Sequence, residues 1–259
     1  MTGSDPPPLA DDALCAALRA GRTIASADLS AIDWEDLDAE GGLFEACLVA
    51  GAALRASRLQ GARFRGCRFL RCRFAHAEMR DAAFEECVFA GPGAEGCTFA
   101  FSALRDVRFL RSDLSFCVFE QARLHNAEFE DCNLRGARFD RADFGHAFGR
   151  KVVQTRGAFR RCNLELADLS GLRLSGCVLA GCRLRETDLA GADLSDADLA
   201  GSDLVQAILA DARLTGADLR GAEIGELNLT ALADFRGMRI DQGQQHLLLA
   251  ALGIVVEPD

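Results

Sequence analysis

The side chains able to carry chemistry are mainly cysteines, and their spacing first suggests a metal or redox site. The chain of 259 residues has 11 cysteines, and the pairs Cys67/Cys72 and Cys177/Cys182 have the C-x4-C spacing found among iron–sulfur ligands. The segment from Gly91 to Gly96, GPGAEG, formally matches the dinucleotide-binding pattern G-x-G-x-x-G. Each hypothesis holds only if the surrounding sequence folds into the matching structure, such as a strand and a long helix on either side of the glycine motif.

The four histidines offer no catalytic arrangement. His76, His125, His146 and His246 are scattered, and the chain contains neither H-E-x-x-H nor the nucleophile elbow G-x-S-x-G. No motif pairs a nucleophile with a base. We therefore expect no catalytic residues and no cofactor, and the chain is not expected to be an enzyme.

A five-residue repeat runs through most of the chain and changes the interpretation of the cysteines. From Ile24 to Leu229, every fifth residue gives 42 positions, of which 20 are Leu and 13 are Phe. The position two residues earlier is mostly Ala, Cys, Ser, Gly or Thr, and ten of the 11 cysteines belong to it. Only Cys15 lies outside this class. The cysteines are therefore predicted to be small buried residues interchangeable with alanine, and no metal site is expected.

A period of five excludes both a regular helix and a continuous strand. In an α-helix, steps of five residues turn by about 500° and spread the apolar positions around the cylinder. In a continuous strand, residues five apart point to opposite faces. A short extended segment followed by a turn in every five residues buries both the large and the small position. The sequence therefore predicts an all-β solenoid, in which GPGAEG is a loop because no helical pattern follows it.

Composition and charge limit the classes of function. The formal charge of −10 argues against direct binding of nucleic acid. The longest apolar stretch, Leu247 to Val256, is too short to span a bilayer. The first residues, with three prolines and no basic region, do not resemble a signal peptide. We expect a cytoplasmic protein with reduced thiols and no membrane contact.

The repeat is interrupted first at residues 90–96. There Pro92 and Ala94 replace the small and the large core residue, so the regular wall cannot continue. This segment is therefore the first of two predicted irregular or loop segments. On a regular scaffold, function is expected at such interruptions of the repeat.

The second interruption, residues 145–157, is the candidate binding element and is called the partner loop below. Gly149 and Gln154 occupy core positions of the frame, which resumes unchanged at Phe159, so any excursion spans a multiple of five residues. The loop is basic and holds the only lysine of the chain. The alternative is an irregular stretch of coil wall with no partner. The candidate partner-binding residues are Gly145, His146, Phe148, Arg150, Lys151, Gln154 and Arg156.

Helix signals flank the repeat at both ends. Asp11 or Asp12 to Ala20, stopped by Gly21, predicts a short helix over the first coil. At the other end the frame slips by one residue after Leu229.

The C-terminal segment predicts a helix that does more than cover a coil end. Asp241 is the expected N-cap, with Gln244 as its capping-box partner. The helix should run from Gln245 to Leu252 and end at Gly253. Its apolar residues and the extended tail exceed what protection of the last sheet edge needs, so we expect a homodimer through this end. The candidate dimer residues are Leu247, Leu248, Ala251, Leu252, Ile254, Val255 and Val256.

Charge is unevenly distributed along the repeat. Residues 46–75 carry seven arginines and no acid, and the Arg-rich band from Arg55 to Arg73 is a candidate surface for an acidic partner. The coil from Leu184 to Asp203, the acidic coil below, has five net negative charges, a density like that of duplex DNA, which has about three charges per 4.8 Å. The alternative is that aspartate before leucine is simply the usual outward residue of the repeat. The acidic coil comprises Glu186, Asp188, Asp193, Asp196, Asp198 and Asp203.

Repeats of the form A-(D/N)-L-x-x resemble the pentapeptide-repeat family. Examples are Ala62-Arg63-Phe64, Ala127-Glu128-Phe129, Ala167-Asp168-Leu169 and Ala197-Asp198-Leu199. This resemblance implies a right-handed quadrilateral β-helix with four pentapeptides per coil. With the helix signals it divides the chain into an N-terminal tail and capping helix (1–21), the β-helix (22–240) and a C-terminal helix and tail (241–259).

The C-terminal stretch resembles the ending of the Qnr and MfpA quinolone-resistance proteins. The similarity rests on FRGMRIDQGQ at 235–244 and LGIVV at 252–256, together with the position of the partner loop. It implies a dimeric rod that mimics duplex DNA, binds a type II topoisomerase (DNA gyrase or topoisomerase IV), and protects it from poisons such as fluoroquinolones or a self-made antibiotic. The alternative is a non-enzymatic interaction scaffold or regulator of the pentapeptide-repeat family with no topoisomerase partner.

Overall fold

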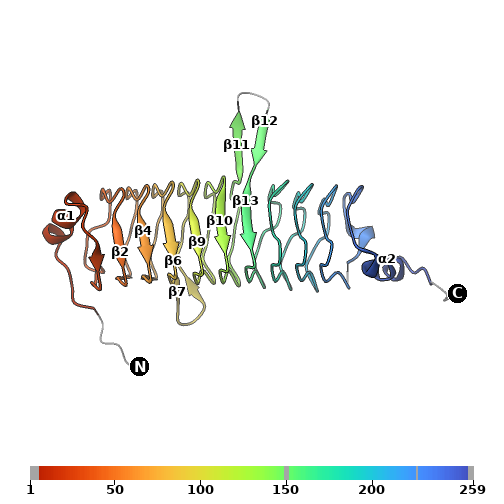
Figure 1. Ribbon diagram of the computed structural model, residues 1–259, viewed down its shortest axis with the longest axis horizontal. Coiled ribbons are helices and arrows are strands. Elements are labelled where there is room, and N and C mark those ends of the chain that lie inside the picture. Colours follow the sequence, from red (N-terminus) through yellow and green to blue (C-terminus); the bar gives the residue numbers. More distant parts are fainter. Residues whose placement is uncertain (1–5, 149–151, 226, 256–259) are drawn as a thin grey trace.

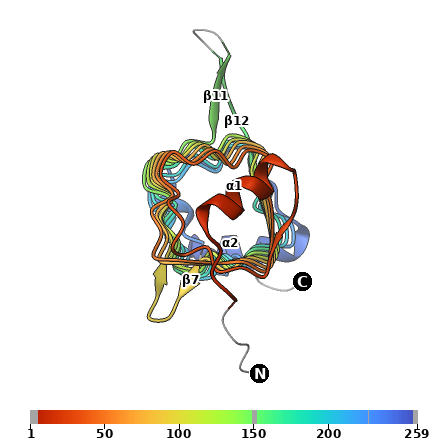
Figure 2. The ribbon, with the colours of Figure 1, turned by 90° about the vertical axis from the view of Figure 1, so that its left-hand side faces the viewer.

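Each turn of the backbone advances the chain by 20 residues and places it beside the preceding turn. The computed structural model describes residues 6–148, 152–225 and 227–255. In it, parallel strand pairs place Ile24 beside Phe44, Phe44 beside Phe64, and Phe64 beside Phe84. Viewed along the stack, the coils superimpose in a four-sided outline (Figure 2), and from the side they form a long rod (Figure 1). A solenoid built mostly from parallel strand pairs is thus confirmed, and its handedness stays a prediction.

The regular elements are short, because each side of a coil contains only a few extended residues before the next turn. Seven strands form one parallel sheet, β1-β2-β4-β6-β9-β10-β13, and β3 pairs in parallel with β5. Elsewhere the wall is joined by isolated parallel bridges. The elements are α1 (Asp11–Arg19), β1 (Ile24–Ala25), β2 (Leu43–Glu45), β3 (Leu48–Ala50), β4 (Arg63–Arg65), β5 (Arg68–Leu70), β6 (Ala83–Glu85), β7 (Ala90–Gly91), β8 (Glu95–Gly96), β9 (Arg108–Leu110), β10 (Ala127–Glu130), β11 (Gly145–Phe148), β12 (Val152–Thr155), β13 (Gly157–Arg160), the 3-10 helices η1 (Leu229–Ala231) and η2 (Gln242–Gln244), and α2 (Gln245–Ala251).

Stacked aromatic rings fill the middle of the rod. Phe129 lies between Phe109 and Phe159, with ring centroids 5.1 and 4.8 Å away. All three side chains are buried, and buried leucines such as Leu179 and Leu199 continue the column toward the C-terminus. Aromatic pairs of this kind contribute about 0.5–1.5 kcal/mol beyond the burial of their surface. The predicted inner ladder of Phe and Leu is therefore the core.

The corners of the coil are made by residues with positive φ. The residue two places after a large core residue takes this conformation, as at Gly61 (φ 65°), Asp81 (57°) and Arg161 (52°). Glycine adopts it freely, whereas other residues adopt it at a cost of about 1–2 kcal/mol. The many glycines at this position of the repeat follow from that conformation, although polar residues and a few apolar ones such as Phe101 and Leu166 also occupy it.

Both interruptions of the repeat are antiparallel hairpins that project from the rod (Figures 1 and 2). Across β7 and β8 the offset between parallel partners is 25 residues instead of 20, as in the pair Val88 and Asp113. Across β11 and β12 the offset is 30, as in the pair Phe129 and Phe159. The second hairpin thus lengthens its coil by a multiple of five residues, as predicted. The segment 90–96 forms a short hairpin, because its two ends pair with each other.

The N-terminal segment before α1 joins the wall, although it lies outside the five-residue repeat. Asp28 N donates a hydrogen bond to Pro7 O at 2.7 Å, and Leu9 N donates to Asp28 O at 3.0 Å. Prolines are tolerated here because the outer side of an edge strand needs no N–H donor. The predicted helix is α1, which buries Leu14 and lies across the N-terminal end of the rod (Figure 2).

The C-terminal helix is tied to the last coils through one glutamine. The capping box between Asp241 and Gln244 is present as predicted. Gln244 Nε2 also donates to Leu219 O and to Ala222 O, each at 2.7 Å. The frame slip is confirmed by offsets of 21 residues, as in the pair Arg213 and Asp234. The helix α2 ends at Ala251, one residue before the predicted end.

Candidate protein-interaction site

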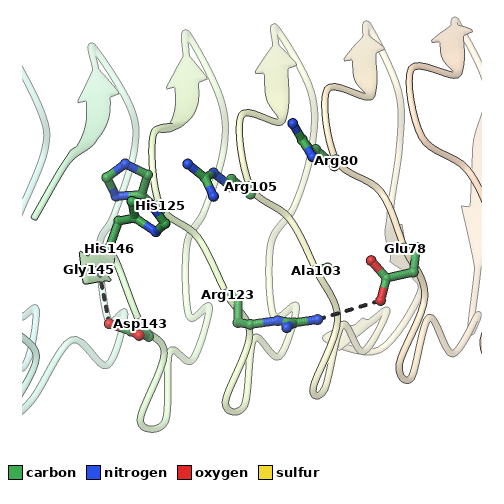
Figure 3. Close-up of a pocket in the computed structure, with 9 residues that line it drawn as sticks. All are labelled: Glu78, Arg80, Ala103, Arg105, Arg123, His125, Asp143, Gly145 and His146. Carbon is green, nitrogen blue, oxygen red and sulfur yellow. Dashed lines mark hydrogen bonds and ion pairs between the residues drawn. The ribbon is translucent and has the colours of Figure 1, made fainter. Parts of the chain in front are cut away.

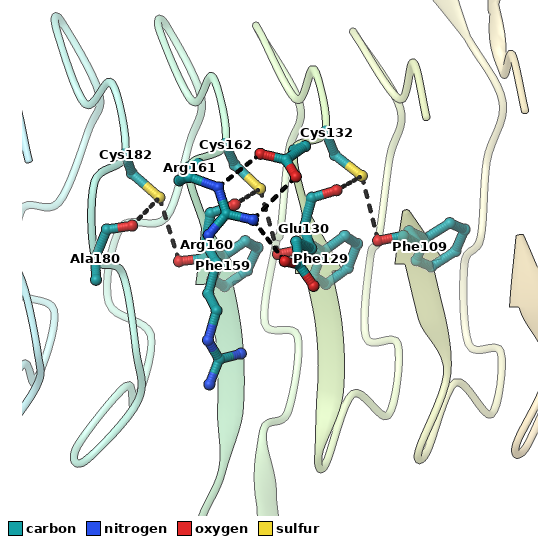
Figure 4. A network of polar contacts seen from close by, with 11 residues as sticks. Phe109, Phe129, Glu130, Cys132, Phe159, Arg160, Arg161, Cys162, Ala180 and Cys182 are labelled. Carbon is teal, nitrogen blue, oxygen red and sulfur yellow. Dashed lines mark hydrogen bonds and ion pairs between the residues drawn. The ribbon is translucent and has the colours of Figure 1, made fainter. Parts of the chain in front are cut away.

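The repeat cysteines form packing columns inside the wall (Figure 4). Cys132 Sγ donates to Phe109 O, and Cys162 Sγ donates to Phe129 O, both at 3.4 Å. In the same column, Ser112 Oγ donates to Phe84 O at 3.3 Å, so a hydroxyl takes the place of the thiol. All 11 cysteines are free, and no set of three His, Cys, Asp or Glu side chains among the described residues could hold a metal ion.

The thiols are expected to be inert in the folded protein. Ten are buried, and burial raises the pKa of Cys177 to about 12, which removes the reactive thiolate at neutral pH. Titration with a thiol reagent should therefore modify Cys15, which is partly exposed, and reach the other ten only after denaturation. Rapid modification of several thiols in the native protein would contradict the packing role.

The partner loop is a hairpin whose base is fixed to the coil wall. Gly145 N donates to Asp143 Oδ1 at 2.9 Å, and Arg156 N donates to Phe144 O at 3.0 Å. His146 is paired in register with Gln154, which is exposed on β12 and does not occupy the core position that the frame assigned to it.

Of the remaining candidate residues of the partner loop, two are described by the structure and two are not. Phe148 ends β11, and Arg156 is exposed at the junction with β13. Arg150 and Lys151 lie outside the described residues. Gly157 is buried in β13, so the projecting segment ends before the boundary predicted at 157.

A groove of about 360 Å³ lies at the base of this hairpin (Figure 3). Arg80, Arg105 and His125 line one edge, and His146 from β11 lies beside His125 with ring centroids 5.1 Å apart. His125 Nδ1 is 3.1 Å from Phe144 O. Partial desolvation and the nearby Arg105 lower the pKa of His146.

This groove was missed because its residues align only when the length of the first hairpin is known. Arg80 and Arg105 are 25 residues apart in sequence, and an uninterrupted coil of 20 residues would have placed Arg80 beside Ala100. The bridge between Glu78 and Ala103 shows the actual offset of 25.

The acidic coil does not form a patch on one face. Its aspartates 188, 193, 198 and 203 each belong to a different side of the rod, because successive core residues occupy successive sides. Each accepts a backbone N–H two residues later, at 2.9–3.1 Å, in an Asx turn. Arg185 contacts Asp203 at 3.2 Å. Glu186 and Asp196 are exposed at corners. The six residues therefore surround the rod as a ring, and four of them help to shape the turns.

Acidic side chains next to this coil are partly neutralised. Asp218 accepts from Arg220 at 2.7 and 2.9 Å and lies 3.3 Å from Arg239, and these arginines lower its pKa to about 2. The negative surface does continue from Asp188 to Asp168, its partner in the preceding coil.

The Arg-rich band balances the acidic N-terminal coils. Arg58 donates to Asp38 at 2.8 Å, and Arg55 contacts Glu35 at 3.4 Å, each across one coil. These pairs are exposed, so each contributes at most about 1 kcal/mol. Part of the band is thus used within the chain, which the residue counts alone did not show.

The C-terminal apolar residues divide into two groups. Leu247 and Leu248 are partly buried and pack against the core of the rod. Leu252, Ile254 and Val255 are 47, 48 and 80% exposed, and Ala251 is exposed as well. Val256 lies outside the described residues. An outward apolar surface remains after the helix has covered the coil end.

Family models for pentapeptide repeats match residues 51–91, 104–147, 162–199 and 192–230. These matches cover more than half of the chain and coincide with the coils described above. The chain belongs to the pentapeptide-repeat family. This pentapeptide-repeat protein contains no helix, in its described parts, with the length and apolar character needed to cross a membrane.

Solved structures of QnrB1, a plasmid-mediated fluoroquinolone resistance protein, resemble most of this chain. Two trypsin-treated forms match with TM-scores of 0.76 and 0.74 and identities of 27 and 28%, covering 82% of this chain and 99% of theirs. Full-length QnrB1 matches with a TM-score of 0.72 at 27% identity, covering 80% of this chain and 100% of its own. No curated protein sequence matches this pentapeptide-repeat protein.

Proposed function

We propose that this pentapeptide-repeat protein is a non-enzymatic, cytoplasmic rod that binds a type II topoisomerase and protects it from topoisomerase poisons. The observation that supports this proposal most is the similarity to the fluoroquinolone resistance protein QnrB1, which extends over nearly all of the QnrB1 chain. In this proposal the rod presents DNA-like negative charge to DNA gyrase or topoisomerase IV, and the partner loop supplies a specific contact.

Two features of the rod agree with such a partner. The acidic coil surrounds the rod near its C-terminal end, so negative charge is presented whichever side faces the enzyme. The partner loop projects from the middle of the rod, where it reaches beyond the wall (Figure 1). A rigid scaffold with a projecting loop is a common arrangement for binding.

A second candidate function is an interaction scaffold or regulator with a different partner. The Asx turns made by Asp188, Asp193 and Asp198 favour it, because they explain these carboxylates by the geometry of the coil without DNA mimicry.

Equilibrium binding separates these two functions. The chain would be immobilised and exposed to purified DNA gyrase and topoisomerase IV, with and without competing duplex DNA. Saturable micromolar binding that duplex DNA weakens is the result expected for a DNA mimic. Absence of binding to both enzymes would leave only the scaffold function.

We further propose that two copies associate through the exposed residues after Leu248. The double substitution Leu252→Asp and Val255→Asp should give a monomer in light scattering, because each buried charge would lack a partner in the interface. Leu248 is a poorer choice, since it also packs against its own coil.

Ile208→Asp is the matched control for this dimer test, because Ile208 is 50% exposed on the wall of the rod. It should leave the dimer intact. A monomeric unmodified chain at micromolar concentration would rule out this interface.

A further inference from the structure

The groove at the base of the partner loop is open because its floor residue is small. Glu78, Ala103, Arg123 and Asp143 follow one another in register on four successive coils, so this edge carries two carboxylates and one arginine. Arg123 extends over Ala103 and contacts Glu78 Oε1 at 3.5 Å, which closes one edge of the groove (Figure 3). A larger side chain at 103 would fill the space between the two edges.

The opposite edge is a row of basic side chains. Arg80, Arg105 and His125 each follow the large core residue of the same side, in three successive coils (Figure 3). Asp81 and Asp106 lie next to the two arginines. The neighbouring coils of such a wall are about 4.8 Å apart. The row therefore presents several donors over a short distance along the rod axis.

The guanidinium groups of this row are only weakly engaged within the chain. Arg80 Nε is 3.5 Å from Asp81 Oδ2, and Arg105 Nε is 3.4 Å from Asp106 Oδ2. Both distances exceed those of good N–H···O hydrogen bonds, and Arg105 Nε makes no hydrogen bond.

The guanidinium group of Arg161, in contrast, is closely hydrogen-bonded within the chain (Figure 4). It donates to Asp131 at 2.8 and 2.9 Å and to Glu130 at 2.5 Å. The contrast indicates that Arg80 and Arg105 retain the capacity to bind carboxylates from outside.

We propose that this groove binds an extended acidic segment of a protein partner, with Arg80 and Arg105 each pairing with one of its carboxylates. In an extended strand, side chains on the same face recur about every 6.6–6.8 Å. Two arginines rooted one coil apart can reach carboxylates at that spacing, and arginine pairs with carboxylate in a bidentate geometry. His146 on β11 places the occupant against the hairpin as well as the rod.

A nucleic acid fits this groove less well than a short acidic peptide. A DNA strand carries a phosphate at every nucleotide, and in this groove the phosphates would meet Glu78 and Asp143 on the lining as well as the carboxylates beside Arg80 and Arg105. The chain also has a net charge of −10, which repels an extended polyanion. This inference does not depend on the identity of the protein that supplies the segment.

Fluorescence anisotropy with a labelled hexapeptide of alternating glutamate and serine tests the groove directly. We expect saturable binding at low salt. The double substitution Arg80→Gln and Arg105→Gln should weaken it by about tenfold or more, since two charge-assisted contacts are lost. Ala103→Glu should have a similar effect, because it places a competing carboxylate inside the groove while keeping every arginine.

Matched controls change the same charge elsewhere on the rod. Arg160→Gln with Arg213→Gln, which lie outside both the groove and the Arg-rich band, and separately Ala83→Glu, should alter the affinity by less than about twofold. The proposal would be overturned if the peptide did not bind, or if the control and groove variants lost affinity equally. It would also be overturned if a DNA oligonucleotide of equal charge bound more tightly, or if millimolar inorganic phosphate displaced the peptide completely. No topoisomerase is present in this assay, so its failure is distinguishable from failure of the proposed function.

Discussion

Deletion of residues 145–154 is expected to abolish protection of DNA gyrase from ciprofloxacin while the rod stays folded. The partner loop adds ten residues to one coil, as the offset of 30 between Phe129 and Phe159 shows. The deletion removes those ten residues and places Phe159 five residues after Phe144, so the repeat continues in frame. If the hairpin makes a specific contact, its loss should weaken binding to gyrase by at least about tenfold, or about 1.4 kcal/mol.

Circular dichroism and thermal unfolding serve as the structural check for this deletion. Stability should change by no more than about 1 kcal/mol, because a short surface loop is removed and the wall is closed. Deletion of 91–95 is the matched control, since it removes the shorter hairpin and also restores the frame. Unchanged protection by a folded 145–154 deletion would exclude the partner loop as a contact element.

The substitution Phe129→Ala is expected to lower the free energy of unfolding by about 3–5 kcal/mol. Phe129 is fully buried and lies between two stacked rings, with Phe119 edge-on at 6.0 Å. Because each coil contacts only its neighbours, the cavity should weaken the middle of the rod and split its unfolding into separate steps.

Phe129→Leu is the conservative comparison for this core test. Leucine already occupies the same column at Leu179 and Leu199, so the loss should be only about 1–2 kcal/mol. Chemical denaturation followed by circular dichroism measures both variants. Equal losses for alanine and leucine would mean that ring stacking and cavity formation do not control stability here.

The five-residue frame made most of the fold predictable. Large and small apolar residues two apart can be buried together only on a short extended segment, and the structure places both Phe129 and Ala127 of β10 in the core. The capping box at Asp241 was also predictable, because its two hydrogen bonds depend on residues three apart in the sequence.

Features that depend on alignment between coils were not predictable. The offsets of 25 and 30 residues decide which side chains are neighbours, and the sequence does not show how far a hairpin extends before the wall resumes. The row formed by Arg80 and Arg105 therefore became visible only in the structure. The same holds for the pairing of Pro7 and Leu9 with Asp28, where a proline-rich tail joins the wall.

The candidate site was predictable in part. The partner loop was located from two core positions that lacked large residues, and it is a projecting hairpin. The acidic coil was identified from charge density, and four pentapeptides per coil already implied that its charges are spread over four faces. The Asx turns of its aspartates became visible only in the structure.

The most direct measurement of the central proposal is DNA supercoiling by gyrase in the presence of ciprofloxacin, with increasing amounts of the purified chain. We predict that micromolar protein restores supercoiling and reduces the drug-induced cleaved DNA, and that excess protein inhibits gyrase because it competes with DNA. Neither protection nor inhibition over that range would contradict the proposal that this rod acts on gyrase.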